Sequence, residues 1–261
     1  MQTYRCVIEY DGTDFSGWQF QPEQRTVCGA VERTLSSLFD EPIKVTCAGR
    51  TDTGVHATGQ TISFTSERRF PIQRLALALN ANLPPDVTAR DATLAPEGFS
   101  ARHHALSRTY EYVILNRAMP SATLRRFAHH VYKPIDHERF RHAADHMVGI
   151  HDFVSFCGVH PDRGGTVRTI TSIDIECDAD IVRVRIEGLS FLHRMIRITI
   201  GTLVEIATGR RDANDIPRII AACDREAAGY TAPATGLYLA GVRYADFDSY
   251  RRVRVPIAET L

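Results

Sequence analysis

One short polar loop carries the residue types that could do chemistry. It runs over residues 47–57 (CAGRTDTGVHA) and has Asp52 at its centre. Gly54 and a second glycine five residues earlier allow sharp turns of the backbone or its close approach to a ligand, while Arg50 and His56 bring cationic or hydrogen-bonding groups to the single carboxylate. A buried, hydrogen-bonded Asp beside Arg is ionised, and an ionised carboxylate can act as a nucleophile or a base.

The elements on either side of the loop must position this carboxylate. Residues 42–47 (PIKVTC) and 59–65 (GQTISFT) alternate with the period of two that is typical of half-buried strands. The loop is therefore expected to be held at both ends. The alternative is that Asp52 only bonds its own backbone in a turn, which is the commoner use of an Asp between Thr and Gly.

The string from Gly49 to Ala57 (GRTDTGVHA) closely resembles the GRTDAGVHA signature of the TruA-type tRNA pseudouridine synthases. The resemblance implies that Asp52 is the catalytic nucleophile, and we assign Arg50 to catalysis and Gly54 and His56 to substrate binding. This chain has Thr53 in place of the usual Ala, a change that we expect to be tolerated.

Further blocks extend the resemblance over nearly the whole chain: YDGTDFSGWQ (10–19), HDFVSF (151–156), FLHRMIR (191–197) and GLYL (236–239). The family's helix Arg, here Arg197, meets the catalytic Asp, and its substrate-contacting Tyr is here Tyr110. Trp18, the chain's one Trp, belongs either to a base-stacking platform or to a core turn. Glu111 and Ile198 depart from the family pattern and raise doubt about RNA affinity.

The resemblance implies a fold as well as a reaction. The expected fold class is α+β, with two pseudo-repeated halves that form one curved, mainly antiparallel sheet, helices on its outer face and a central RNA-binding cleft. The implied activity is the conversion of uridine to pseudouridine at positions 38, 39 and 40 of the tRNA anticodon stem-loop by a homodimer. An isomerisation within one nucleotide requires no redox partner or group donor, so no cofactor is expected.

Two rival functions remain. An RNA-binding module that has lost catalysis would not need its intact Asp52, Arg50, Tyr110 and Arg197. A carboxylate-dependent nucleoside glycosidase would need a second acidic group against the same bond, and Asp11 and Asp14 are the candidates.

Composition excludes several other classes. The 261 residues are 44% hydrophobic and 24% charged, as in an ordinary globular protein, and no apolar run approaches the roughly 20 residues that span a bilayer. The N-terminus has no signal-like apolar stretch, so we expect a cytoplasmic protein. Six cysteines without a C-x-x-C pair, and histidine pairs without ligand spacing, predict neither disulfides nor a metal site.

Net charge is zero, with 31 basic and 31 acidic side chains, but the cations are unevenly placed. Residues 100–133 hold six Arg or Lys residues and one acidic residue. This basic band fits contact with phosphates, although a coding bias towards Arg would also produce an excess of arginines.

The pattern of elements predicts domains at 1–105, which carries the Asp loop, and at 106–247, which completes the cleft, followed by a charged tail at 248–261. A long helix is expected over 191–208. Projected at about 100° per residue, it places His193, Arg194 and Arg197 on one cationic stripe. The alternative for this stripe is a solvated helix face.

Overall fold

The chain forms two compact units in the computed structural model, which describes residues 1–161 and 164–252. Residues 1–108 and 238–261 make up the first unit, and residues 109–237 the second. The domain boundaries given above remain predictions. Of the tail expected at 248–261, all but its first five residues lies outside the described part of the chain.

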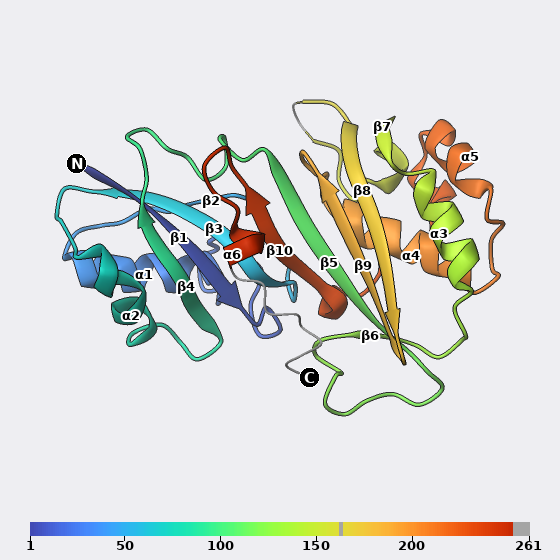
Figure 1. The fold of residues 1–261 in the computed structure, drawn as a ribbon, viewed down its shortest axis with the longest axis horizontal. Coiled ribbons are helices and arrows are strands. Elements are labelled where there is room, and N and C mark those ends of the chain that lie inside the picture. The colour runs from blue at the N-terminus through green and yellow to red at the C-terminus, as the bar shows by residue number, and fades with distance from the viewer. Residues whose placement is uncertain (162–163, 253–261) are drawn as a thin grey trace. The chain divides into compact units, whose positions relative to one another are not determined.

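The first unit holds five strands, two helices and a short C-terminal turn of helix among its described residues (Figure 1). Its elements are β1 (Gln2–Tyr10), α1 (Val27–Phe39), β2 (Thr46–Cys47), β3 (His56–Ser66), α2 (Ile72–Asn80), β4 (Val87–Leu94), β10 (Leu237–Arg243) and α6 (Ser249–Arg252).

Strand β1 lies between β4 and β3 and is antiparallel to both, whereas β10 pairs in parallel with β3. Nearly every residue of β1 and β3 is buried, because helices and loops cover this sheet. At the core, the ring of Tyr4 stacks on Phe64 at 5.0 Å, and Phe39 from α1 meets Phe64 edge to face at 5.4 Å. The alternating pattern of residues 59–65 thus becomes a central strand.

Helix α1 shows how local sequence sets the bounds of an element. The side chain of Thr26 accepts a hydrogen bond from the Gly29 N–H and caps the N-terminus, and Asp40 ends the helix at a φ of 48°. Val27, Val31 and Leu35 recur on its buried face. Helix α2 packs on α1 and β4.

The second unit holds β5 (Ser107–Asn116), β6 (His129–Val131), α3 (His137–Asp145), β7 (Gly149–Asp152), β8 (Val167–Asp178), β9 (Ile181–Gly188), α4 (Met195–Ala207) and α5 (Asp215–Ala222). The short helical turns Val154–Phe156, Arg225–Ala227 and Ala234–Gly236 complete it. Its strand order is β5, β9, β8, β7, with β6 parallel to β5. Figure 1 shows α3, α4 and α5 grouped beside β7, β8 and β9.

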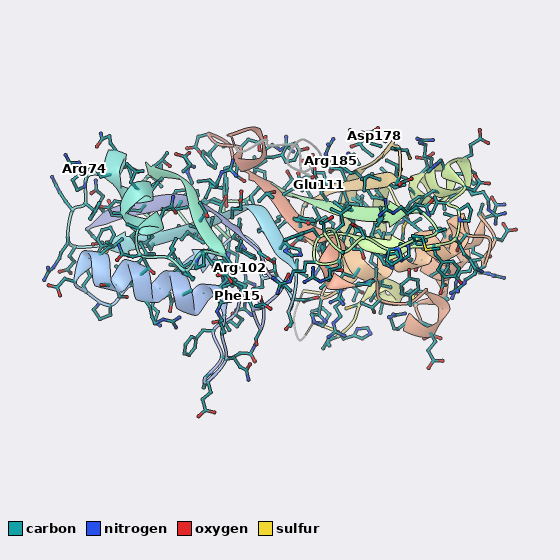
Figure 2. The ribbon with its side chains drawn as sticks, turned by 90° about the horizontal axis from the view of Figure 1, so that it is seen from below. Phe15, Arg74, Arg102, Glu111, Asp178 and Arg185 are labelled. Atoms are coloured by element: carbon teal, nitrogen blue, oxygen red, sulfur yellow. The ribbon has the colours of Figure 1, made fainter. Side chains whose placement is uncertain are left out.

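Strand β5 is a core strand, since residues 112–115 are buried on both of its faces. Glu111 is an exception that the strand accommodates: its Oε1 lies 3.3 Å from the Nε of Arg185 in β9 (Figure 2). The negative charge that the sequence places beside Tyr110 is therefore paired with a cation on the neighbouring strand.

The expected fold class, α+β with mainly antiparallel strands, is confirmed. Several individual elements differ from their predictions. Only Thr46–Cys47 of the strand expected at 42–47 pairs as a strand, and the expected turn around His151 includes the four-residue strand β7. Helix α4 begins at Met195 rather than at residue 191.

The late start of α4 corrects the predicted cationic stripe. Arg194 has a φ of 58°, so it and His193 precede the helix, and a helical projection does not apply to them. The face that carries Arg197 and Gly201 is not solvated either. The segment 228–232 covers it, and the N–H of Ala232 donates to the C=O of Arg197 at 3.0 Å.

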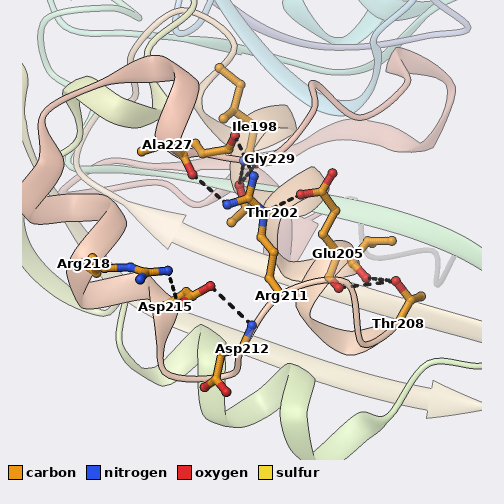
Figure 3. Close-up of polar contacts among 12 residues, drawn as sticks. Ile198, Thr202, Glu205, Thr208, Arg211, Asp212, Asp215, Arg218, Ala227 and Gly229 are labelled. Atoms are coloured by element: carbon orange, nitrogen blue, oxygen red, sulfur yellow. Dashed lines mark hydrogen bonds and ion pairs between the residues drawn. The ribbon is translucent and has the colours of Figure 1, made fainter.

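A polar network holds this covering segment in place (Figure 3). Arg211 donates from Nε to Glu205 on α4 at 2.6 Å and from Nη1 to the C=O of Ala227 at 2.8 Å. The hydroxyl of Thr202 donates to the C=O of Ile198 and accepts from the N–H of Gly229, both at 2.8 Å. The contact is close enough that a Cβ on Gly201 would lie 1.8 Å from the C=O oxygen of Tyr230.

This contact predicts that Ala substitutions at two helical glycines differ in their effect on unfolding free energy. Gly201→Ala drives a methyl group into backbone, so we expect a loss of about 1–3 kcal/mol of unfolding free energy or more. Gly29→Ala in α1 meets only side-chain atoms, at 3.0 Å and beyond. Because Ala favours helix over Gly, the Gly29 variant should stay within about 1 kcal/mol of wild type. Urea denaturation measures both, and equal stability of the two variants would contradict the packing of α4.

Candidate active site

Asp52 lies on a tight turn in the loop between β2 and β3. The N–H of Val55 donates to the C=O of Asp52 at 3.1 Å, which closes a four-residue turn. Gly54 occupies the third position with a φ of 78°, in the left-handed region that this kind of turn requires and that glycine adopts without strain. The turn leaves the side chain of Asp52 half-buried and that of Thr53 exposed.

The chain after β1 packs its backbone directly against this turn. The N–H of Trp18 donates to the C=O of Thr51 at 3.0 Å, and that of Gly54 donates to the C=O of Phe15 at 3.4 Å. A Cβ on Gly17 would lie 2.8 Å from the carbonyl oxygen of Thr51. Trp18 and Phe15 are both buried, so Trp18 belongs to a core turn and not to an exposed base-stacking platform.

Three side chains complete the support of the loop. Gln60 of β3, fully buried, donates from Nε2 to the C=O of Gly49 at 2.6 Å and accepts from its N–H. The hydroxyl of Tyr10 lies 2.8 Å from that of Thr51. Arg108 donates to the C=O of Ala48 from Nε and Nη2, at 3.3 and 3.1 Å. The loop before Asp52 is thus bonded through the backbone of Ala48 and Gly49 and through the side chain of Thr51.

His56 lies beneath the loop and not on its surface, with 1% of its side chain exposed. Its ring stacks on Tyr238 at 4.8 Å. The Nδ1 atom is 3.1 Å from the N–H of Gly12 and 3.2 Å from a carboxylate oxygen of Asp11. A backbone N–H can only donate, so Nδ1 accepts the hydrogen bond from Gly12. His56 therefore holds the block around Gly12 against the loop.

Arg50 is exposed, and its side chain makes no hydrogen bond or ion pair with any residue that the structure describes. It does not pair with Asp52. Its charge still affects the pKa of the Cys47 thiol. Burial raises this pKa to about 11, and the Arg50 charge acts to lower it. A neutral thiol excludes Cys47 as the nucleophile of this loop at ordinary pH.

Tyr110 and Arg197 belong to the second unit. Tyr110 on β5 is buried and meets Phe191 edge to face at 5.2 Å. Arg197 on α4 is half-buried and donates from Nε to the C=O of Ala232 at 2.8 Å. That bond fixes the direction of the guanidinium group. Asp52, Arg50, Gly54 and His56 are brought together in the first unit, and the pairing of Arg197 with Asp52 stays a prediction.

Sequence analysis missed the residues that support the loop. Gln60 is an uncharged polar residue inside an otherwise apolar strand pattern, and a buried amide of this kind needs a partner, which is the signal that could have found it. Tyr10 and Arg108 gave no such signal, because their partners lie 41 and 60 residues away in the sequence.

The described residues give no support for a metal site or a membrane-spanning helix. Across residues 1–161 and 164–252, no group of three or more His, Cys, Asp or Glu side chains could hold a metal ion. In the same residues, none of the helices is both long and apolar enough to cross a membrane.

His129 is neutral at pH 7. Burial is the larger cause and the nearby His130 the smaller one, and together they lower the pKa of His129 to about 4.

A mixed α+β chain that presents one half-exposed carboxylate on a braced turn matches the class of the pseudouridine synthases. The profile of the family described as tRNA pseudouridine synthase matches residues 6–102 and 143–245. The tRNA pseudouridine synthase A of Halalkalibacterium halodurans is 42% identical over 91% of this chain and 90% of its own length. That of Bacillus subtilis is 40% identical over 92% and 98%, and that of Caulobacter vibrioides 39% over 94% and 100%. The chain belongs to the tRNA pseudouridine synthase family.

The turn geometry predicts that Gly54 is needed for function and not only for stability. An Ala at positive φ costs about 1–2 kcal/mol, so Gly54→Ala should lose roughly that much unfolding free energy. It should also lose at least about tenfold in kcat, since a small shift of a catalytic group has a large effect.

Gly98→Ala is the matched control. Gly98 has a φ of 75° with no atom within 4 Å of an added Cβ, so it carries the same backbone strain away from the loop. The two variants should lose similar stability in urea denaturation, with only Gly54→Ala losing turnover. Similar kcat values for both would show that the turn does not set the position of Asp52.

Proposed function

We propose that this protein converts uridine to pseudouridine in tRNA and that its targets are positions 38, 39 and 40 of the anticodon stem-loop. The observation that carries the proposal is the half-exposed Asp52 on a turn whose backbone is bonded at residues 48, 49, 51 and 54. Membership of the family supports the reaction class. The choice of positions and the homodimer rest on the resemblance of the sequence blocks, and the cytoplasmic location rests on the composition of the chain.

The reaction breaks the C1'–N1 glycosidic bond, turns the uracil and forms a C1'–C5 bond, after which the C5 proton leaves to solvent and N1 takes up a proton. Substrate and product are isomers, so atoms balance without a donor or an oxidant. The carboxylate of Asp52 attacks either C1' or C6 and leaves when the new bond has formed. A uridine within a stem must first leave its stack.

The remaining candidate residues take supporting roles. Tyr110 packs on the flipped base, and its edge-to-face contact with Phe191 sets the plane of its ring. By resemblance to the family, Arg197 pairs with Asp52, and its Nε is already engaged by the C=O of Ala232. A guanidinium within about 4–6 Å of a carboxylate lowers the carboxyl pKa by roughly 1–3 units. Arg197 thus keeps the nucleophile ionised.

The contacts of Asp11 weigh against a glycosidase. Such an enzyme needs a second carboxylate poised on the scissile bond, and Asp11 Oδ1 is taken up by the N–H and hydroxyl of Thr13, at 3.0 and 2.6 Å. An inactive RNA-binding module would have no reason to keep the turn at Gly54 and the bracing by Gln60.

The first functional prediction concerns Asp52. Asp52→Asn keeps the size and the turn but is a far weaker nucleophile, so it should bind tRNA as wild type does and lose at least about 10³-fold in turnover. Release of tritium from [5-³H]uridine in tRNA measures the reaction, because only formation of the C5 glycoside removes that label while the base stays attached.

Asp14→Asn is the matched control, an amide substitution at another carboxylate of the same unit. It should retain wild-type tritium release. Release by Asp52→Asn within tenfold of wild type would overturn the nucleophile assignment, and free uracil formed by the wild-type protein would point to a glycosidase.

The second prediction concerns Arg197. A nearby guanidinium favours the ionised form of a carboxyl group, so its removal should favour the protonated, inactive acid, most of all at low pH. Arg197→Met should therefore lose most activity near pH 5–6 and regain part of it towards pH 9, with Arg197→Lys between the two. Single-turnover rates on saturating tRNA from pH 5 to 9 measure the shift.

Arg218→Met is the control for this series. Arg218 is an exposed arginine on α5 that pairs with Asp215 at 2.7 Å, and its loss should leave the pH profile unchanged. A wild-type profile for Arg197→Met would show that Asp52 has another partner.

A further inference from the structure

Arg108 bonds two segments that are far apart in sequence. Besides its bonds to the C=O of Ala48, its Nη2 donates to the C=O of Arg102 at 2.9 Å and its Nη1 to that of Ala105 at 3.3 Å. One planar guanidinium thereby links the start of the Asp52 loop to residues 102–105. A lysine, with a single charged nitrogen, cannot reproduce this fork.

The segment joined in this way is anchored at its buried side. Ala101 is fully buried; its N–H donates to the hydroxyl of Ser63 at 2.9 Å, and its C=O accepts from the hydroxyl of Tyr244 at 2.7 Å. The next residues, Arg102 and His103, are exposed. The backbone of the segment is therefore fixed while its cationic side chains face solvent.

Two unpaired guanidinium groups flank the loop as a result. The side chains of Arg50 and Arg102 are both exposed, and neither makes an ion pair with any residue described here. Arg108 bonds the C=O of Ala48, two residues before Arg50, and that of Arg102, so the two backbone segments that carry these exposed cations lie close together. Two exposed cations without an acidic partner among the described residues are the chemistry that receives a phosphate.

We propose that Arg50 and Arg102 bind a backbone phosphate of the RNA next to the target uridine, and that Arg108 is a positioning residue that couples this phosphate site to the Asp52 loop. The inference rests on the proposed function and deepens it. Through Arg108, a phosphate bound at Arg102 sits in a fixed relation to Ala48 and hence to the nucleophile four residues later. Phosphate contacts of this kind set the register of a nucleic acid rather than its sequence specificity.

The phosphate site is tested with Arg102→Ala, using Arg74→Ala as the matched control. Arg74 is also exposed and without an ion pair among the described residues, and Figure 2 shows it at the far end of the first unit from Arg102. Binding of tRNA is measured in an Asp52→Asn background between 50 and 300 mM salt. Arg102→Ala should weaken binding by about threefold to tenfold and reduce the slope of log K against log salt by about one. Arg74→Ala should change neither.

The coupling is tested with Arg108→Lys, alone and combined with Arg102→Ala. Arg108→Lys keeps the charge but loses the fork, so it should lower the single-turnover rate at saturating tRNA by at least about tenfold while its tRNA affinity stays within about threefold of wild type. In the double variant, Arg102→Ala should weaken binding by less than twofold, because the link from residues 102–105 to Ala48 is lost.

The outcomes are distinguishable from failure of the proposed function. If the wild-type protein releases no tritium from tRNA, the function fails, whereas the salt slopes still report on the phosphate site. Equal slopes for Arg102→Ala and Arg74→Ala overturn the phosphate site. A full effect of Arg102→Ala in the Arg108→Lys background, or an unchanged rate for Arg108→Lys, overturns the coupling. If Arg108→Lys does not fold, as judged by its urea transition, Arg102→Ala and Arg50→Ala decide the proposal by whether their slope losses match.

Discussion

The structure depends on one constraint: the carboxylate of Asp52 must be open to a substrate while the backbone beneath it stays fixed. An exposed loop ordinarily bonds to water and moves. Here its polar backbone groups are bonded inward instead, to the amide of Gln60, to the guanidinium of Arg108 and to the N–H of Trp18. The closing hydrogen bond from Val55 to Asp52 and the positive φ of Gly54 then set the direction of the turn.

In the second unit, a helix fixes the candidate charged group. Arg197 is half-buried, and its Nε donates to a backbone oxygen of the segment 228–232, which itself is held on α4 through Arg211 and Thr202. The charge of the guanidinium is thus delivered on a rigid element, with little rotamer freedom left to lose on binding. Both candidate charged groups are preorganised within their own units.

In the first unit, the positive charge around the Asp52 loop comes from arginine side chains, which stay charged across physiological pH. Burial raises the pKa of the Cys47 thiol to about 11, so this thiol is neutral at physiological pH. Arg50, Arg102 and Arg108 keep their charge at every physiological pH. The positive charge of this surface is therefore the same across that range.

The sequence by itself determined the family, the identity of the candidate nucleophile and many of the elements. Helix α2 (Ile72–Asn80) follows local signals, because apolar residues recur along it and Pro71 precedes it. The strand expected at 42–47 failed for a tertiary reason: the N–H groups of Ile43 and Val45 donate to the side chains of Ser36 and Glu32 on α1 and not to a neighbouring strand. Alternation of residue types cannot reveal which partner a backbone group will choose.

Only the tertiary structure decided how the site is braced and which face of α4 is covered. The helix start shifted to Met195 because the C=O of His193 accepts from the N–H of Gly158, 35 residues away in sequence. The roles of Gln60, Arg108 and Tyr10 likewise arise from contacts between segments 11 to 60 residues apart. The sequence carries the chemistry in one contiguous loop, whereas the hydrogen bonds that position it join residues whose proximity depends on how the strands pair.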